Sequence, residues 1–273
     1  MSMSRLWQNV APKPHLCGRF VRCQRFESQF LPESREIMVY LPPSYGQSEQ
    51  RYPVMYMHDG NNLFDPQTAA FQVEWNVDEH LERLCQTRRL PELIVVGIYN
   101  TRERNQEYTW LPRPCKEACK EACKEGFEGG EGPRYARFLV EELKPAIDAH
   151  FATRPEREAT GVSGSSLGGL ISFYLGLYYP DVFSKIGMLS PSVWWQHEQP
   201  LYSARQLSQD LSLWVDMGSQ ESTLEHVRVF VDHLRRQGFS DGLNLLYTEA
   251  AGAAHNEAAW AQRVDDMLCF LFA

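Results

Sequence analysis

Short apolar runs alternate with longer segments of helical periodicity along most of the chain. The apolar runs at 52–58 and 93–98, for example, enclose a charged helical segment at 77–88. Such runs are typical of strands that are buried on both faces of a parallel sheet and connected by helices. The same reasoning predicts the end of a strand at 159–162, strands at 185–190, 211–217 and 243–248, and helices at 134–151, 167–178, 223–236 and 257–271. We therefore expect an α/β fold with a mostly parallel central sheet and helices on both faces.

The N-terminal part follows a different pattern. Residues 19–27 and 35–41 alternate between apolar and polar positions, and Pro42 and Pro43 end the second segment. This alternation is typical of antiparallel strands with one face exposed. It predicts a hairpin ahead of the parallel strands.

A GxSxG motif with Ser166 at its centre lies between the strand ending at 162 and the apolar helical segment 167–178. A serine on a sharp strand-to-helix turn needs small neighbours, and Gly164 and Gly168 supply them. This context makes Ser166 the candidate nucleophile. The alternative is a glycine-rich turn whose serine only contacts solvent.

The composition is that of an ordinary globular protein. The chain has 273 residues, of which 43% are hydrophobic and 23% charged, so one domain covering residues 1–273 is the simplest expectation. The net charge of −8 argues against nucleic acid or an anionic membrane surface as a partner. The first 17 residues lack the apolar centre of a secretory signal, and the seven cysteines show no framework spacing. We therefore expect reduced thiols and a cytoplasmic location.

A four-residue Cys-Lys-Glu-Ala repeat interrupts the α/β pattern. It predicts a helical insertion at about 111–132, bounded by prolines and glycines. Cys115, Cys119 and Cys123 would lie along one ridge of that helix and could together bind a soft metal. Structural zinc sites normally have four ligands, and no fourth is evident, so we expect no metal here. A binding protein that uses these thiols on an inactive hydrolase scaffold is the alternative.

A serine hydroxyl needs an imidazole to take its proton. In GxSxG hydrolases this histidine follows the serine and the acid in the sequence, on a loop after a late strand. His255 fits, because it follows the strand at 243–248 and precedes Asn256, which can cap the last helix. His58 is the rival, since it ends a predicted strand at the edge of the sheet where sites form. Its position before Ser166 contradicts the expected order.

The imidazole in turn needs a carboxylate. The strand at 211–217 and the loop after it offer Asp216 and Glu221. Glu221 is preferred because a carboxylate in the loop can reach the imidazole, whereas Asp216 lies late in the strand. Backbone amides must also stabilise the transition-state charge. We expect one from Leu167, next to the nucleophile, and one from Asn61, in the turn after His58.

Four segments together resemble the esterase D-like esterases, a family that includes enterochelin esterase-like α/β-hydrolases. They are MYMHDGNNLFD at 55–65, GSSLGG at 164–169, SPSVWW at 190–195 and AHNEAAW at 254–260. The resemblance implies an α/β-hydrolase fold and carboxylic ester hydrolysis through an acyl-enzyme, without a cofactor. Ser166, His255 and Glu221 match the family's nucleophile, base and acid, and Asn61 and Leu167 match its oxyanion-hole donors.

The Cys-Lys-Glu-Ala repeat departs from this family. Its loop would leave the carboxyl edge of the sheet, where it could form a lid or a wall of the substrate site. Arg104, Trp194 and Trp195 are candidate substrate-binding residues, although packing is the commoner role of paired tryptophans. The expected partner is a small-molecule ester. Acyl transfer to a hydroxyl acceptor is the alternative reaction on the same scaffold.

Overall fold

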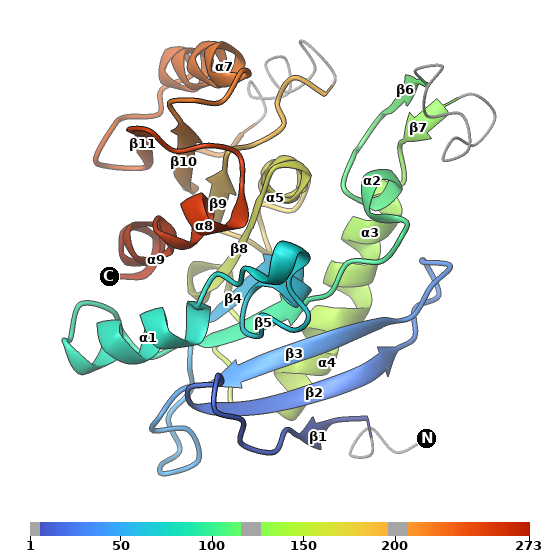
Figure 1. Ribbon diagram of the computed structural model, residues 1–273, viewed down its shortest axis with the longest axis vertical. Coiled ribbons are helices and arrows are strands. Elements are labelled where there is room, and N and C mark those ends of the chain that lie inside the picture. The colour runs from blue at the N-terminus through green and yellow to red at the C-terminus, as the bar shows by residue number, and fades with distance from the viewer. Residues whose placement is uncertain (1–5, 116–126, 196–206) are drawn as a thin grey trace.

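The computed structural model describes residues 6–115, 127–195 and 207–273. Its centre is a nine-stranded sheet in the order β1-β2-β3-β5-β4-β8-β9-β10-β11 (Figure 1). The strands are β1 Gln8–Asn9, β2 Arg19–Phe26, β3 Arg35–Leu41, β4 Val54–His58, β5 Ile94–Ile98, β8 Thr160–Ser165, β9 Lys185–Leu189, β10 Ser212–Gly218 and β11 Leu245–Ala250. Strands β5, β4, β8, β9, β10 and β11 are parallel, which confirms the mostly parallel sheet.

The predicted N-terminal hairpin is also confirmed. Strands β2 and β3 are antiparallel, and β3 joins the parallel part by pairing antiparallel with β5. The short strand β1 pairs with β2 and was not predicted. Its two residues, Gln8 and Asn9, are both exposed and polar, so no apolar alternation signals it.

Helices cover both faces of the sheet, as the sequence predicts. Val77, Leu81 and Leu84 of α1 and Val264 and Met267 of α9 belong to one buried cluster. The continuous segment α3–α4, α5 and α7 pack into the cluster on the other face. The bounds are α1 Val77–Gln86, α2 Arg104–Glu107, α3 Gly132–Arg137, α4 Lys144–His150, α5 Leu167–Tyr178, α7 Leu224–Arg236, α8 Glu257–Ala261 and α9 Val264–Phe272. No helix among the described residues is long and apolar enough to cross a membrane.

Two predicted helices contain irregularities. A π-helical turn, Phe138–Leu143, joins α3 to α4 just before Pro145, which has no N–H to donate to the carbonyl of Glu141. The last helix is divided into α8 and α9 around Arg263. The Arg263 side chain at this break is almost fully buried and pairs with Asp216.

The predicted helical insertion is wrong at both of its ends. Pro112–Pro114 forms β6 and Phe127–Gly129 forms β7, and the two pair as an antiparallel ribbon. Gly129 and Gly130 have positive φ angles of 87° and 96° where the chain leaves the ribbon, a conformation that favours glycine. Cys119, Cys123 and most of the repeat lie outside the described residues. Cys115 is disulfide-bonded, so the expectation of reduced thiols is wrong at this position.

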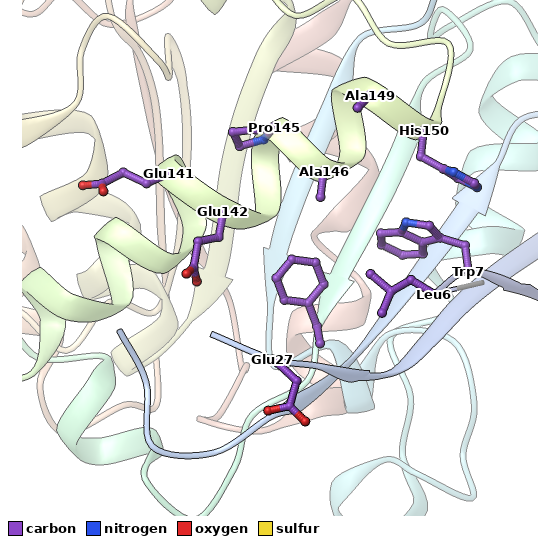
Figure 2. Close-up of a pocket in the computed structure, with 10 residues that line it drawn as sticks. Leu6, Trp7, Glu27, Glu141, Glu142, Pro145, Ala146, Ala149 and His150 are labelled. Atoms are coloured by element: carbon purple, nitrogen blue, oxygen red, sulfur yellow. The ribbon is translucent and has the colours of Figure 1, made fainter. Parts of the chain in front are cut away.

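The N-terminal arm packs against the outer face of α4. A cavity of about 360 Å³ lies between them (Figure 2). Trp7 stacks on the His150 ring with a centroid distance of 5.7 Å and closes one side of the cavity. Glu27, Glu141 and Glu142 contribute carboxylates to its lining. None of the site residues predicted from the sequence lines this cavity.

A buried ion pair connects the hairpin to α2. Arg35 on β3 donates two hydrogen bonds to the Glu107 carboxylate, at 2.9 and 2.8 Å. The two side chains are 0% and 1% exposed, and the Arg35 guanidinium also lies 4.9 Å from the centre of the Phe138 ring. The pair therefore fixes α2, which carries Arg104, against the sheet.

Replacing Arg35 should destabilise the protein strongly. Arg35→Met leaves the Glu107 carboxylate buried without its partner, and we expect a loss of about 3–5 kcal/mol in the free energy of unfolding. Urea denaturation measures this loss. The matched control is Arg137→Met, which breaks the exposed pair with Glu141 and should leave the unfolding midpoint nearly unchanged. Equal midpoints for the two variants would contradict the stabilising role of the buried pair.

Candidate active site

Ser166 occupies a strained turn between β8 and α5. Its φ and ψ angles are 58° and −120°, a backbone conformation that residues other than glycine rarely adopt. A Cβ atom on Gly164 would lie 2.9 Å from the carbonyl carbon of Gly168, so the glycines allow the strand and the helix to approach each other closely. This is the geometry that the GxSxG motif predicts.

The structure brings Ser166, His255 and Glu221 together in a hydrogen-bonded chain. The Ser166 Oγ atom is 3.0 Å from His255 Nε2, and His255 Nδ1 is 2.5 Å from Glu221 Oε2. Glu221 is buried, whereas the His255 side chain is 42% exposed. A hydroxyl, an imidazole and a carboxylate in this order can transfer a proton away from the serine.

Two further donors hold the Glu221 carboxylate. Its Oε1 atom accepts hydrogen bonds from Ser190 Oγ at 2.6 Å and from the Gly218 amide at 2.8 Å. Burial alone would raise the pKa of Glu221, but the hydrogen bonds from His255, Ser190 and Gly218 outweigh it and hold the pKa below its ordinary value. The carboxylate therefore stays ionised and can stabilise a protonated imidazole.

Asp216 is connected to Ser190, and so to Glu221, through Arg263. Its carboxylate accepts a hydrogen bond from Trp214 Nε1 at 2.7 Å and lies 3.0 Å from Arg263 Nε. Arg263 Nη2 in turn donates to Ser190 Oγ at 3.0 Å. The structure thus places Glu221, and not Asp216, against His255.

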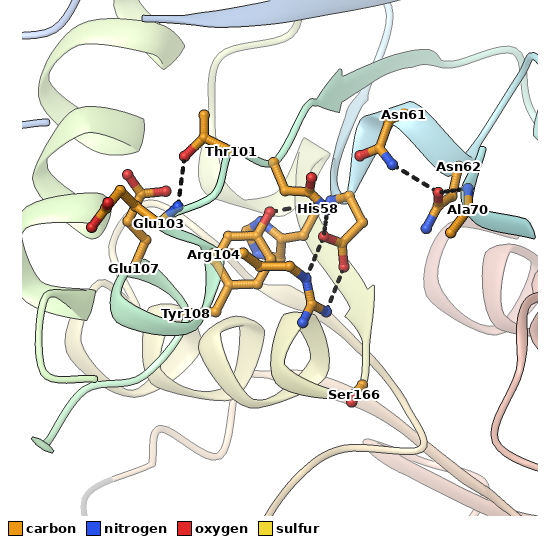
Figure 3. Close-up of polar contacts among 12 residues, drawn as sticks. His58, Asn61, Asn62, Ala70, Thr101, Glu103, Arg104, Glu107, Tyr108 and Ser166 are labelled. Carbon is orange, nitrogen blue, oxygen red and sulfur yellow. Dashed lines mark hydrogen bonds and ion pairs between the residues drawn. The ribbon is translucent and has the colours of Figure 1, made fainter. Parts of the chain in front are cut away.

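The predicted oxyanion donors follow the neighbouring strands β8 and β4. Leu167 is the first residue of α5, where backbone amides have no partner within the helix. Asn61 lies in a short 3₁₀ helix, Gly60–Asn62, directly after β4 (Figure 3). A Cβ atom on Gly60 would lie 2.5 Å from the Gly97 carbonyl carbon, so only glycine lets this turn pack against β5.

Arg104 holds the beginning of the same turn. Its Nε and Nη2 atoms donate to the two oxygens of Asp59 at 2.7 and 2.8 Å, and Asn100 donates at 2.6 Å (Figure 3). Burial opposes ionisation of Asp59, yet Arg104 and Asn100 keep its pKa below the ordinary value. Asp59 has a positive φ of 54°. Arg104, which we expected to bind substrate, therefore also fixes the left-handed residue that precedes Gly60 and Asn61.

Asn62 connects this turn to the loop that carries His255, a contact that sequence reasoning missed. Its Nδ2 atom donates to Glu257 Oε1 at 3.0 Å, and its Oδ1 atom accepts from the Ala70 amide at 2.9 Å. Burial and the charge of Asp59 raise the pKa of Glu257. The sequence does not indicate which of the two adjacent residues, Asn61 or Asn62, contacts α8.

The β6–β7 ribbon packs on Trp194 and Trp195, the two tryptophans predicted to bind substrate. The Arg113 guanidinium lies 3.4 Å from the centre of the Trp195 ring and 5.4 Å from that of Trp194, and it pairs with Glu128 at 2.9 Å. Trp195 is buried and Trp194 is half-buried. The loop that carries these tryptophans also approaches the candidate nucleophile, since Ser192 Oγ is 3.2 Å from Ser166 Oγ. Arg113 was missed because nothing in its local sequence marks it.

One described cluster contains potential metal ligands. Cys17, Asp78 and Glu79 place a thiol and carboxylate oxygens within 4.8 Å of one another. The Cys17 amide donates to Asp78 Oδ2 at 2.7 Å. This contact ties the N-terminal arm to the first turn of α1, where acidic residues are also favoured by the helix dipole. We assign the cluster a structural role.

Comparison with known proteins identifies the family. The profile of the family described as "Putative esterase" matches residues 28–271. The chain belongs to this family and is an esterase. It is 29% identical over 249 residues to the uncharacterized protein YbbA of Bacillus subtilis (strain 168), covering 88% of this chain and 93% of YbbA. It is also 29% identical over 169 residues to the ferri-bacillibactin esterase BesA of the same strain, covering 60% of this chain and 56% of BesA.

Solved structures share the α/β-hydrolase fold of the esterase. An IroE-like serine hydrolase from Shewanella oneidensis superposes with a TM-score of 0.76 at 24% identity, covering 93% of this chain and 80% of that one. The enterobactin esterase FES from Shigella flexneri superposes with a TM-score of 0.69 at 20% identity, covering 90% of this chain and 57% of that one.

His58, the alternative candidate for the base, is packed in the interior of the esterase. Its ring is fully buried between Tyr108 and Tyr135, and its Nδ1 atom lies 2.9 Å from the Tyr135 hydroxyl. Burial lowers the pKa of His58 to about 3, against an opposing effect of Asp59. The ring therefore remains neutral at physiological pH, while His255 contacts Ser166.

This burial predicts a loss of stability in acid. Unfolded His58 takes up a proton below about pH 6.5, whereas the folded form does so only near pH 3, so the unfolded state binds more protons as the pH falls between these values. The free energy of unfolding should therefore decrease by about 2 kcal/mol between pH 6.5 and 5 on account of this residue. Urea denaturation of His58→Gln should show a correspondingly shallower pH dependence.

The control for this measurement is His226→Gln, which changes an exposed histidine of α7. It should retain the pH dependence of the wild type. If His58→Gln retained it as well, neutral burial of His58 would be refuted.

Proposed function

We propose that the esterase hydrolyses carboxylic esters through an acyl-enzyme formed on Ser166. His255 Nε2 takes the hydroxyl proton while Ser166 Oγ attacks the ester carbonyl carbon. The resulting oxyanion accepts hydrogen bonds from the Leu167 and Asn61 amides. When the tetrahedral intermediate collapses, the carbon–oxygen bond to the alcohol breaks, and His255 protonates the leaving alcohol.

Deacylation repeats these steps with water. His255 takes a proton from water, the hydroxide attacks the acyl carbon, and the proton returns to Ser166 as the acid is released. Glu221 stabilises the imidazolium in both halves of the reaction. The observation that carries this proposal is the continuous chain from Ser166 Oγ through His255 to Glu221, with bonds of 3.0 and 2.5 Å.

We further propose that the substrate is a small-molecule ester and that Arg104, Trp194 and Trp195 help to form its site. Arg104 lies against Asp59 at the end of β4, and the tryptophans follow β9. These strands are the two neighbours of β8, which leads to Ser166. Ligands of α/β sheets bind at this carboxyl edge.

A fluorophosphonate probe tests the nucleophile. It should label the wild type on Ser166, as peptide mass spectrometry would show, and Ser166→Ala should lose the label and at least about 1,000-fold in kcat on an aryl ester. Ser163→Ala is the matched control, because Ser163 lies buried in the same β8 strand. It should keep the label. Labelling of another residue in the wild type, or unchanged turnover by Ser166→Ala, would refute the mechanism.

A pair of isosteric changes tests the acid. Glu221→Gln should lower kcat by about 1,000- to 10,000-fold with a small change in KM, because the amide cannot stabilise the imidazolium. Asp216→Asn should lower the thermal midpoint of unfolding and reduce kcat much less, since its carboxylate contacts Arg263 and Trp214. The reverse order of the two kcat values would assign the acid to Asp216.

A further inference from the structure

The connection between β4 and α1 displays an aromatic side chain to solvent. Phe71 is 90% exposed, more than any other large hydrophobic residue in the described parts of the chain. It belongs to a short turn, Ala70–Gln72, in the connection that also contains Asn61. This connection leaves the carboxyl end of β4, the edge of the sheet at which Ser166 lies.

The backbone that carries this ring is strained. Phe71 has φ and ψ angles of 57° and 15°, and the next residue, Gln72, has a φ of 58°. Two consecutive non-glycine residues in the left-handed region are unfavourable, and such strain persists only where the surroundings impose it. A glycine at either position would avoid the penalty. A phenylalanine that is both strained and exposed gains little stability from burial.

The surroundings impose this conformation through Asn62. The Asn62 side chain accepts a hydrogen bond from the Ala70 amide at 2.9 Å (Figure 3). The backbone carbonyl of Asn62 accepts one from the Trp75 amide at 2.8 Å. The Thr68 hydroxyl donates to the Asn61 carbonyl at 2.7 Å. Phe71 is thus carried by a loop that is hydrogen-bonded on both sides to the turn with the proposed oxyanion donor.

The same asparagine links this loop to the catalytic histidine. Asn62 donates to Glu257, which lies two residues after His255. On the other side of the nucleophile, the loop after β9 carries the half-buried Trp194. Because β4 and β9 are the two neighbours of β8, the loops on either side of the Ser166 turn each present an aromatic side chain.

We propose that Phe71 is a substrate-contacting residue that makes the esterase select esters bearing an aromatic group. The ring packs against the aryl group of an ester whose carbonyl lies at Ser166, and the strained loop holds the ring at the rim of the site. Aromatic pairs gain attraction beyond the burial of area, so the contact favours aryl over small aliphatic esters. This inference rests on the proposed ester hydrolysis.

Three substrates test the selection. Methyl benzoate carries its ring on the acyl side, phenyl acetate carries it on the alcohol side, and ethyl acetate has none. Phe71→Ala should raise KM and lower kcat/KM about three- to tenfold for at least one aryl ester, while ethyl acetate is unaffected. The aryl ester that loses more identifies the side of the substrate that the ring contacts. Phe71→Tyr should keep the wild-type ratios.

The matched control is Leu243→Ala, which removes another exposed apolar side chain, 79% exposed and far along the chain. It should change neither the ratios nor KM. Phe71→Gly should show the same loss as Phe71→Ala together with a higher thermal midpoint, since glycine relieves the strain. Unchanged ratios in Phe71→Ala, or an equal fall for all three esters, would overturn the proposal.

A binding measurement separates this proposal from the catalytic one. Calorimetric titration of Ser166→Ala with phenyl acetate and with methyl benzoate, compared with Ser166→Ala/Phe71→Ala, reports the contact without turnover. Weaker binding of an aryl ester by the double variant supports the contact even if the wild type proves inactive. Equal binding of both esters by the two proteins would overturn it. Inactive wild type by itself refutes only the ester hydrolysis.

Discussion

The proposed chemistry of the esterase depends on the anchorage of one buried carboxylate. Glu221 reaches His255 with one oxygen, while Ser190 and the Gly218 amide hold the other. A buried carboxylate with fewer donors would be driven toward its neutral form, and a neutral acid would stabilise the imidazolium less. The position and the charge of the proposed catalytic imidazole thus both depend on donors that come from the ends of β9 and β10.

A second framework holds the opposite side of the site. Arg35 and Glu107 are buried as a pair and secure α2 against the sheet. From α2, Arg104 reaches Asp59 and fixes the left-handed residue at the end of β4. The turn with Asn61 is thereby attached to the sheet through charges that have little access to water, where hydrogen bonds are stronger than at an exposed surface.

The features that could be predicted from the sequence have local causes. The parallel strands follow from short apolar runs, and the turn at Ser166 follows from its glycines and the apolar helix after it. His255 and Glu221 were predicted from their loops after late strands, and the structure brings His255 to Ser166 and Glu221 to His255. The fold class is confirmed on these grounds.

Other features depend on contacts between distant segments. Asn62 and Glu257 are 195 positions apart, and Arg113 meets Trp195 only because the ribbon folds over the loop after β9. The ends of the insertion were predicted to be helical because the repeat is rich in strong helix formers. That composition gives no information on the flanking residues, which pair as strands β6 and β7. The break at Arg263 was missed for a similar reason, since the partner of its side chain is a buried acid on another strand.

The break between α8 and α9 connects the C-terminal helix to the proposed active site through Arg263. Arg263 lies at the start of α9 and contacts both Asp216 and Ser190, so the C-terminal helix contributes a positive charge next to the residues that hold the proposed triad. Undocking of α9 would withdraw this charge and remove one of the two donors to Ser190 Oγ, leaving the hydrogen bond from Trp260 Nε1. On the proposed mechanism, loss of turnover can therefore precede global unfolding, and ester hydrolysis would report on whether the last helix is docked.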